Sequence, residues 1–216
     1  MPVKFQSLNC MVWKVPYLAV VFDASASYEG MSLNDHLLQG PDLINSLVGA
    51  LSRFREETVA FIGDIEAMFY QVKVPAAQHD YLRFLWWCND DLSDEPEEYR
   101  MIVHFIVAVS SPSIANFVLK HIADKIECTY GYQVANTIRR HFYVDNCLKS
   151  TCDQNTATQL IKDLTSACAM GGFHLTKYTC NKSKVLSTLP KEECSKHVQA
   201  CNLDYDDLPI ERALGI

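Results

Sequence analysis

The chain has 216 residues, of which 49 % are apolar and 21 % are charged. That length can bury a sizeable core as one large domain or two small subdomains, and that composition excludes a disordered tail. The formal net charge of −7 argues against a broad nucleic-acid surface, because phosphate contacts come from Lys and Arg, although it leaves room for a local basic groove.

The cysteine and apolar patterns bear on the compartment. Nine cysteines occur without a CxxC pair, which predicts reduced thiols in an intracellular protein. The apolar run Val15–Phe22 is far shorter than a membrane-spanning helix and is followed by Asp23. We therefore expect no membrane partner, and the sequence does not distinguish cytoplasm from nucleus.

The first half of the chain predicts strands around one helix. Residues 41–55 place apolar side chains at three- and four-residue spacing after a proline that suits a first helical turn. The run Val59–Val74 predicts a strand that meets Asp64 and continues into another strand-like run. Further strands are expected, from β-branched and aromatic residues, at Tyr17–Phe22, Tyr81–Trp87 and Tyr99–Val109.

The second half predicts two amphipathic helices and more strands. Ser110-Ser111-Pro112 offers a cap and a first-turn proline, so a helix should begin there. Its expected buried stripe is Ile114, Phe117, Val118, Ile122 and Ile126. Asn155–Met170 predicts a second helix that ends at Gly171-Gly172. Its inward positions are Leu160, Ile161, Leu164 and Ala167. Phe173–Lys177 and Lys184–Leu189 predict strands, and this irregular order of elements favours an α+β fold.

Two acidic positions stand out within these elements. His141–Ser150, with the sequence HFYVDNCLKS, predicts a strand, a turn at Asp145-Asn146 and a second strand. On this stretch alone both residues are simply turn formers. Asp64, however, ends a buried strand, where a lone carboxylate is costly unless it is paired or bound to metal. Asp64 facing Asp145 could hold two Mg²⁺ ions for phosphoryl transfer.

Several strings carry a family resemblance. FYVDN resembles the YxDD box of reverse transcriptases, and DIEAMF resembles their first catalytic motif, an aspartate followed five residues later by an aromatic. Longer strings, in order along nearly the whole chain, resemble the reverse transcriptase of Pao/BEL-type long-terminal-repeat retrotransposons. They are VVFDASA, SLNDHLLQGPDL, RFLWW, EYRM, SSPSIANF, GGFHLTK and ERALGI.

The resemblance implies an architecture. It predicts one reverse transcriptase domain over residues 1–216, with a polymerase palm formed by a ferredoxin-like antiparallel sheet backed by helices. Fingers are expected at about residues 1–38 and 72–109, and the palm at about 39–71 and 110–216. The thumb and ribonuclease H parts of family members are expected to be absent.

The resemblance also implies a site. Asp64, Asp145 and Asn146 occupy its catalytic positions, and Asp64, Ile65 and Asp145 its positions for two Mg²⁺ ions, or Mn²⁺ in their place. The nucleotide-binding positions are Ile65, Phe69, Val107 and Lys177. Phe69 would exclude a 2′-hydroxyl, and Lys177 would face the triphosphate. Without the family resemblance, Phe69 would be interpreted as a core aromatic and Lys177 as an exposed strand lysine.

Three positions depart from the family pattern. Ala19 replaces an arginine that contacts the triphosphate in the family, and alanine has no guanidinium group to bind phosphate. Val107 replaces a glycine, so a β-branched side chain should crowd the nucleotide pocket. Asn146 replaces the second aspartate of the YxDD box, which keeps an oxygen ligand and loses a charge.

Two functional hypotheses follow. The first is an RNA-directed DNA polymerase that uses an RNA or DNA template with primer and deoxynucleoside triphosphates, as part of a retroelement polyprotein, and is impaired by the three departures. The second is a decayed or co-opted fragment that binds nucleic acid or protein without chemistry. A small RNA-binding module is disfavoured, because the strands lack the paired aromatics of an RNP box.

Overall fold

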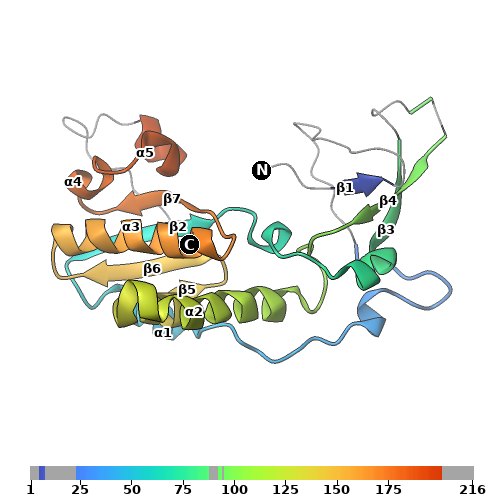
Figure 1. The fold of residues 1–216 in the computed structure, drawn as a ribbon, viewed down its shortest axis with the longest axis horizontal. Coiled ribbons are helices and arrows are strands. Elements are labelled where there is room, and N and C mark those ends of the chain that lie inside the picture. The colour runs from blue at the N-terminus through green and yellow to red at the C-terminus, as the bar shows by residue number, and fades with distance from the viewer. Residues whose placement is uncertain (1–4, 8–22, 88–91, 94, 201–216) are drawn as a thin grey trace. The chain divides into compact units, whose positions relative to one another are not determined.

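A computed structural model describes residues 5–7, 23–87, 92–93 and 95–200. The chain divides into two compact units, which are treated separately (Figure 1). The first unit comprises Met1–Pro41 and Phe69–Ser111, and the second comprises Asp42–Met68 and Pro112–Ile216. The predicted strand Tyr17–Phe22 and the departure at Ala19 lie outside the described residues.

The first unit contains a small antiparallel sheet with the strand order β1-β4-β3. Its strands are β1 (Phe5–Ser7), β3 (Arg83–Trp86) and β4 (Glu97–Met101). Short 3₁₀ turns are η1 (Asn34–His36), η2 (Met68–Gln71), which spans the boundary, and η3 (Ala76–Leu82). One buried cluster of this unit consists of Ala24, Met101, Val103, Phe105 and Ala108, and Val72, Val74 and Tyr99 are buried as well.

The second unit contains a four-stranded antiparallel sheet in the order β5-β6-β2-β7. The strands are β2 (Val59–Ile65), β5 (Phe142–Tyr143), β6 (Asn146–Thr151) and β7 (Leu175–Cys180). Along β2, buried residues alternate with half-buried ones from Val59 to Ile65. Because side chains alternate along a strand, Asp64 lies on the more open face of the sheet and Ile65 on the buried face.

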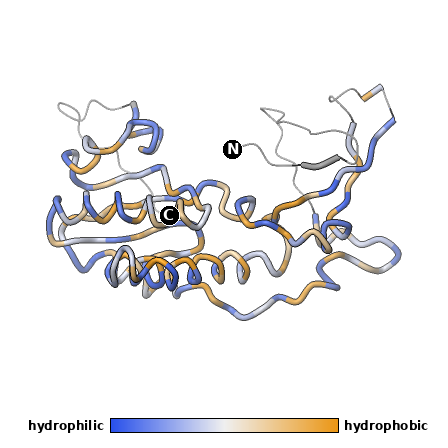
Figure 2. The backbone as a smooth tube through the Cα atoms, viewed as in Figure 1, coloured by the Kyte–Doolittle hydropathy of each residue, from blue (hydrophilic) through white to orange (hydrophobic). Residues whose placement is uncertain are grey.

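Helices cover this sheet. They are α1 (Leu47–Phe54), α2 (Ser111–Arg140, interrupted by a non-helical Gly131), α3 (Gln154–Met170), α4 (Ser183–Leu186), η5 (Lys191–Glu193) and α5 (Lys196–Ala200). Polar and apolar residues alternate along α3 (Figure 2), and its four predicted inward residues are all buried. A Cβ added at Gly171 would lie 2.1 Å from Ile122 Cδ1, so the end of α3 packs tightly on α2. The predicted α+β class, an antiparallel sheet backed by helices, is confirmed.

Several predicted elements have different bounds. The strand predicted at Phe173–Lys177 is β7, which begins two residues later and ends three residues later. The helix predicted from residue 41 begins only at Leu47, because the Ser46 side chain caps it by accepting from the Gly49 N–H. The strand expected at Tyr99–Val109 ends at Met101. The strand-like run after Asp64 becomes the 3₁₀ turn η2 and a single bridge between Lys73 and Val103.

Two further predictions were wrong. Lys184–Leu189 was expected as a strand, but Ser183–Leu186 form a helical turn that buries both Val185 and Leu186. A short apolar run does not by itself distinguish these two structures. Phe117 was expected in the buried stripe of α2 but is 61 % exposed and stacks on His121, because the stripe runs through Ala115 and Leu119 instead.

Candidate functional site

The two aspartates come together in the second unit. Asp64, near the end of β2, pairs in register with Asn146, the first residue of β6. The Ile65 N–H donates to the Asp145 carbonyl at 2.9 Å, which ties the end of β2 to the hairpin turn. Burial, and next the nearby charge of Asp64, raise the pKa of Asp145. Asp64 therefore lies close enough to Asp145 for the two negative charges to repel each other.

The hairpin turn differs from the prediction by one position. Its two central residues are Val144 and Asp145, because Tyr143 already pairs with Asn146. The left-handed backbone expected at Asp145-Asn146 instead falls on Val144, with φ 55°. A β-branched residue rarely adopts this conformation, at a cost of about 1–3 kcal/mol. Strand pairing on both sides of the turn holds Val144 there.

Asn146 contacts the carboxylate that precedes it. Its Nδ2 donates to Asp145 Oδ1 at 2.7 Å. An aspartate at this position could not donate that bond, so the departure from YxDD exchanges a negative charge for a hydrogen-bond donor.

Lys177 faces Asp64. Its Nζ lies 2.6 Å from Asp64 Oδ1, with the two side chains 56 % and 24 % exposed, respectively. The contact depends on a bulge in β7: the register shifts between Ile62 and Asp64, and Lys177 has φ 53°. A bulge re-aims a side chain. The interpretation of Lys177 as only an exposed strand lysine therefore leaves out its contact with Asp64. Nucleotide binding by Lys177 stays a prediction.

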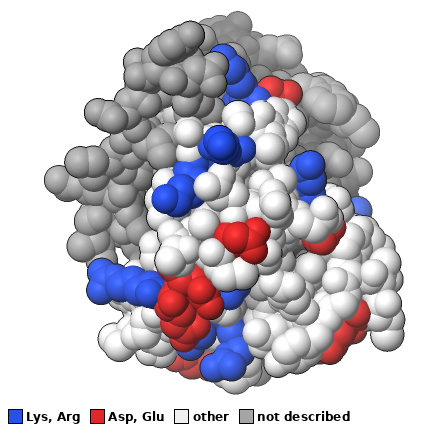
Figure 3. Space-filling view, turned by 90° about the vertical axis from the view of Figure 1, so that its left-hand side faces the viewer, with Lys and Arg blue, Asp and Glu red and all other residues white. Residues whose placement is uncertain are grey.

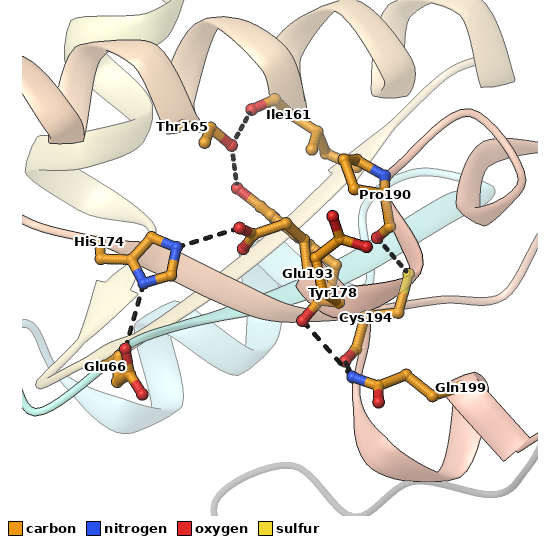
Figure 4. A network of polar contacts seen from close by, with 10 residues as sticks. Glu66, Ile161, Thr165, His174, Tyr178, Pro190, Glu193, Cys194 and Gln199 are labelled. Atoms are coloured by element: carbon orange, nitrogen blue, oxygen red, sulfur yellow. Dashed lines mark hydrogen bonds and ion pairs between the residues drawn. The ribbon is translucent and has the colours of Figure 1, made fainter. Parts of the chain in front are cut away.

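Tyr178 supports the bulge from the buried side. A Cβ added at Gly63 would lie 2.9 Å from Tyr178 Cε1, so only glycine leaves room for the ring. The Tyr178 hydroxyl bonds to Thr165 Oγ1 at 2.6 Å, and Thr165 donates to the Ile161 carbonyl at 2.8 Å (Figure 4). Sequence reasoning missed this support; the only signal was a glycine inside a strand.

A second polar cluster, which the sequence did not predict either, lies next to Asp64 and Asp145, the acidic pair. His174, just before β7, contacts Glu66 Oε2 through Nδ1 at 3.2 Å and Glu193 Oε1 through Nε2 at 3.1 Å (Figure 4). Burial opposes protonation of His174, but its hydrogen bonds to the two glutamates outweigh burial and raise its pKa. The same bond to His174 lowers the pKa of Glu66.

The remaining predicted nucleotide-binding residues, Phe69 and Val107, belong to the first unit. Phe69 begins the turn closed by the Val72 N–H, which donates to its carbonyl at 3.1 Å. Val107 packs against the core of its unit, and Asn34 contacts the carbonyl of Val107 and the N–H of Val109. Their roles at the acidic pair stay predictions.

The carboxylate oxygens of the acidic pair are suitable ligands for a hard cation. Carboxylate oxygens are the ligands that Mg²⁺ prefers, and Mg²⁺ is usually held by one or two carboxylates plus substrate phosphates. Two carboxylates with like-charge repulsion fit that pattern. Among the described residues no group of three or more His, Cys, Asp or Glu side chains could hold a metal ion.

A pocket lies apart from Asp64 and Asp145. A pocket of about 480 Å³ is found at the opposite end of β2, where its lining includes Thr58, Cys152, Lys182 and Lys184. On the face drawn in Figure 3, basic side chains are interspersed with acidic ones. Among the helices of the described ranges, none is long and apolar enough to cross a membrane.

Comparisons with known proteins bear on the fold. No protein-family model matches the chain, and no curated protein matches it. One similar solved structure is a foamy viral protease-reverse transcriptase in complex with double-stranded DNA, with a TM-score of 0.52 and 13 % identity. The match covers 76 % of this chain and 24 % of that one, so the chain spans about a quarter of its length. The similarity indicates a reverse-transcriptase-like fold.

Proposed function

We propose that the chain is the reverse transcriptase domain of a Pao/BEL-type retrotransposon, which adds deoxynucleotides to a primer on an RNA or DNA template. The observation that carries this proposal is the placement of Asp64 beside the Asp145 turn, on neighbouring antiparallel strands of a reverse-transcriptase-like fold. In the proposed architecture the second unit is the palm and the first unit contributes the fingers.

The chemistry proposed for this site is two-metal nucleotidyl transfer. The carboxylates of Asp64 and Asp145 and the backbone carbonyl of Ile65 would hold Mg²⁺, or Mn²⁺, and the ions would activate the primer 3′-hydroxyl and stabilise the leaving oxygen. Lys177 would present its charge to the triphosphate, and Phe69 would bar a 2′-hydroxyl. The Val144 turn and the β7 bulge fix the directions of Asp145 and Lys177, which is the kind of positioning that phosphoryl transfer requires.

The alternative is a fold that has lost its chemistry. Asn146 satisfies Asp145 with a hydrogen bond, and Lys177 neutralises Asp64, so both carboxylates already have partners within the chain. A close charge pair is worth ~4 kcal/mol, of which solvation leaves only a part. Even that part is enough for the loss of one charge beside a divalent ion to lower the rate by orders of magnitude. A chain of this kind would at most bind nucleic acid.

Primer extension on an RNA template separates these possibilities. The native sequence, Asp64→Asn and the triple revertant Ala19→Arg, Val107→Gly, Asn146→Asp should each be joined to the same thumb segment and tested with Mg²⁺ and then Mn²⁺. Extension by the native chain that is abolished in Asp64→Asn supports the enzyme. Extension by the revertant alone supports the decayed fragment, and extension by neither overturns the polymerase proposal.

A further inference from the structure

Both carboxylates of the acidic pair accept bonds from the chain itself. Lys177 Nζ lies 2.6 Å from Asp64 Oδ1, and Asn146 Nδ2 donates to Asp145 Oδ1 at 2.7 Å. The ammonium carries a full positive charge, whereas the amide contributes only a dipole. Asp64 is thus the carboxylate whose charge the chain neutralises.

The backbone directs Lys177 to this position. Thr176 is the partner of Asp64 across β2 and β7, so in a regular strand Lys177 would point to the opposite face of the sheet. The extra residue on β7 and the left-handed φ of 53° at Lys177 break that alternation. The buried ring of Tyr178, seated on Gly63, fixes the strand immediately after the bulge. The fold itself therefore places the ammonium on Asp64.

We infer that Lys177 is a resident cation of Asp64, which a divalent metal ion must displace, and that it thereby sets the metal affinity of the site. The inference rests on the proposed function, in which Asp64 holds metal. An ammonium and a metal ion compete for the same carboxylate oxygens, and two cations held side by side repel each other. The Lys177 side chain is 56 % exposed, so the displaced ammonium has room to turn toward the phosphates of an incoming nucleotide.

Binding of Mn²⁺ to the whole chain, measured from the electron paramagnetic resonance signal of the free ion, tests this inference. Lys177→Met removes the ammonium but keeps a side chain of similar length, and should bind Mn²⁺ about tenfold more tightly. Lys177→Arg keeps the charge and should remain within about threefold of the native affinity. Lys184→Met changes an exposed lysine of α4 in the same unit and should leave the affinity unchanged.

Each outcome decides a different point. Equal affinity of the native chain and a folded Lys177→Met overturns the inference and leaves metal binding intact. A Lys177 ammonium resonance that does not shift at saturating Mg²⁺ also overturns it, without needing any variant. If none of the chains binds Mn²⁺, both the inference and the proposed function fail. If the affinities follow the predicted order without primer extension, the inference stands and the polymerase proposal fails.

Discussion

The ring of Tyr178 lies over Gly63 so closely that a Cβ added to Gly63 would come 2.9 Å from Tyr178 Cε1 and 3.2 Å from Cδ1. Gly63 immediately precedes Asp64, and Tyr178 immediately follows Lys177. One packing contact on the buried face of the sheet therefore joins the two residues whose ion pair lies on the open face. Changes to this contact should affect both stability and the ion pair.

Gly63→Ala should destabilise the second unit. The added methyl group must push the Tyr178 ring, whose hydroxyl is held by Thr165, and overpacking of this kind costs about 1–3 kcal/mol. Urea denaturation followed by circular dichroism measures the cost. Gly49→Ala is the matched control, since its Cβ would come 3.1 Å from Arg53 Nη1, at the end of a long side chain, and 3.7 Å from Ser46 Cβ, which is an ordinary contact. The alanine should add up to about 1 kcal/mol to the stability of the helix. Equal stability of Gly63→Ala and the native chain would contradict the packing argument.

His141 should make the fold sensitive to acid. Burial, and next the positive charges of Lys149 and Arg53, lower its pKa from 6.5 to about 4, and its Nδ1 has no hydrogen-bond partner among the described residues. The unfolded chain therefore binds more protons than the folded chain between these pKa values, so stability falls as pH falls through that window. The loss reaches about 2 kcal/mol near pH 5 relative to neutral pH.

His141→Gln removes this titration and provides the comparison. The free energy of unfolding from urea curves at about pH 7.5 and about pH 5 should fall by roughly 2 kcal/mol less in His141→Gln than in the native chain. If the two chains lose the same stability, His141 does not remain neutral in the folded state.

Long periodic patterns predicted much of the second unit. The inward residues of α3 followed from their spacing, because a stripe repeated over 17 residues has few alternative structures, and its end followed from Gly171-Gly172. The His141–Ser150 hairpin was also predicted, but its turn residue was not. Asn146 favours a left-handed turn position, but it pairs with Tyr143 as part of a strand. The left-handed backbone therefore falls on Val144.

The ion pair at the site could not be predicted from local pattern. Lys177 reaches Asp64 only because of the β7 bulge, and the bulge is packed by Gly63, Tyr178 and Thr165, which are far apart in the sequence. Likewise, Glu66, His174 and Glu193 meet only after folding. Single charged residues without a common period carry no signal of such contacts, whereas the family resemblance predicted positions for Asp64 and Asp145 without predicting their partners.

Asn146→Asp should change the response of stability to Mg²⁺. It replaces the donor to Asp145 with a third negative charge, so without divalent ions the chain should lose about 1–2 kcal/mol. Millimolar Mg²⁺ should recover most of that loss if the carboxylates bind it, because a ligand of the folded state stabilises it. Thermal melting with and without Mg²⁺ measures both effects. Asn146→Ala loses the bond without adding charge but keeps Asp64 and Asp145, so Mg²⁺ should stabilise it less than it stabilises Asn146→Asp. A recovery of Asn146→Asp that persists when Asp64→Asn is added would argue against metal on these carboxylates.

His174 should stay protonated to higher pH than an ordinary histidine. Its bonds to Glu66 and Glu193 raise its pKa, so their stabilising contribution is full below the ordinary value of 6.5 and is lost as pH rises through the raised pKa. The cluster is partly exposed, with the His174 side chain 36 % accessible, which limits the contribution to about 1 kcal/mol. Glu193→Gln should lower the pKa of His174 in an NMR titration of its ring protons. Glu192→Gln, a neighbouring change on η5, should not; an equal shift in both would mean that general surface charge, and not the His174–Glu193 contact, sets this pKa.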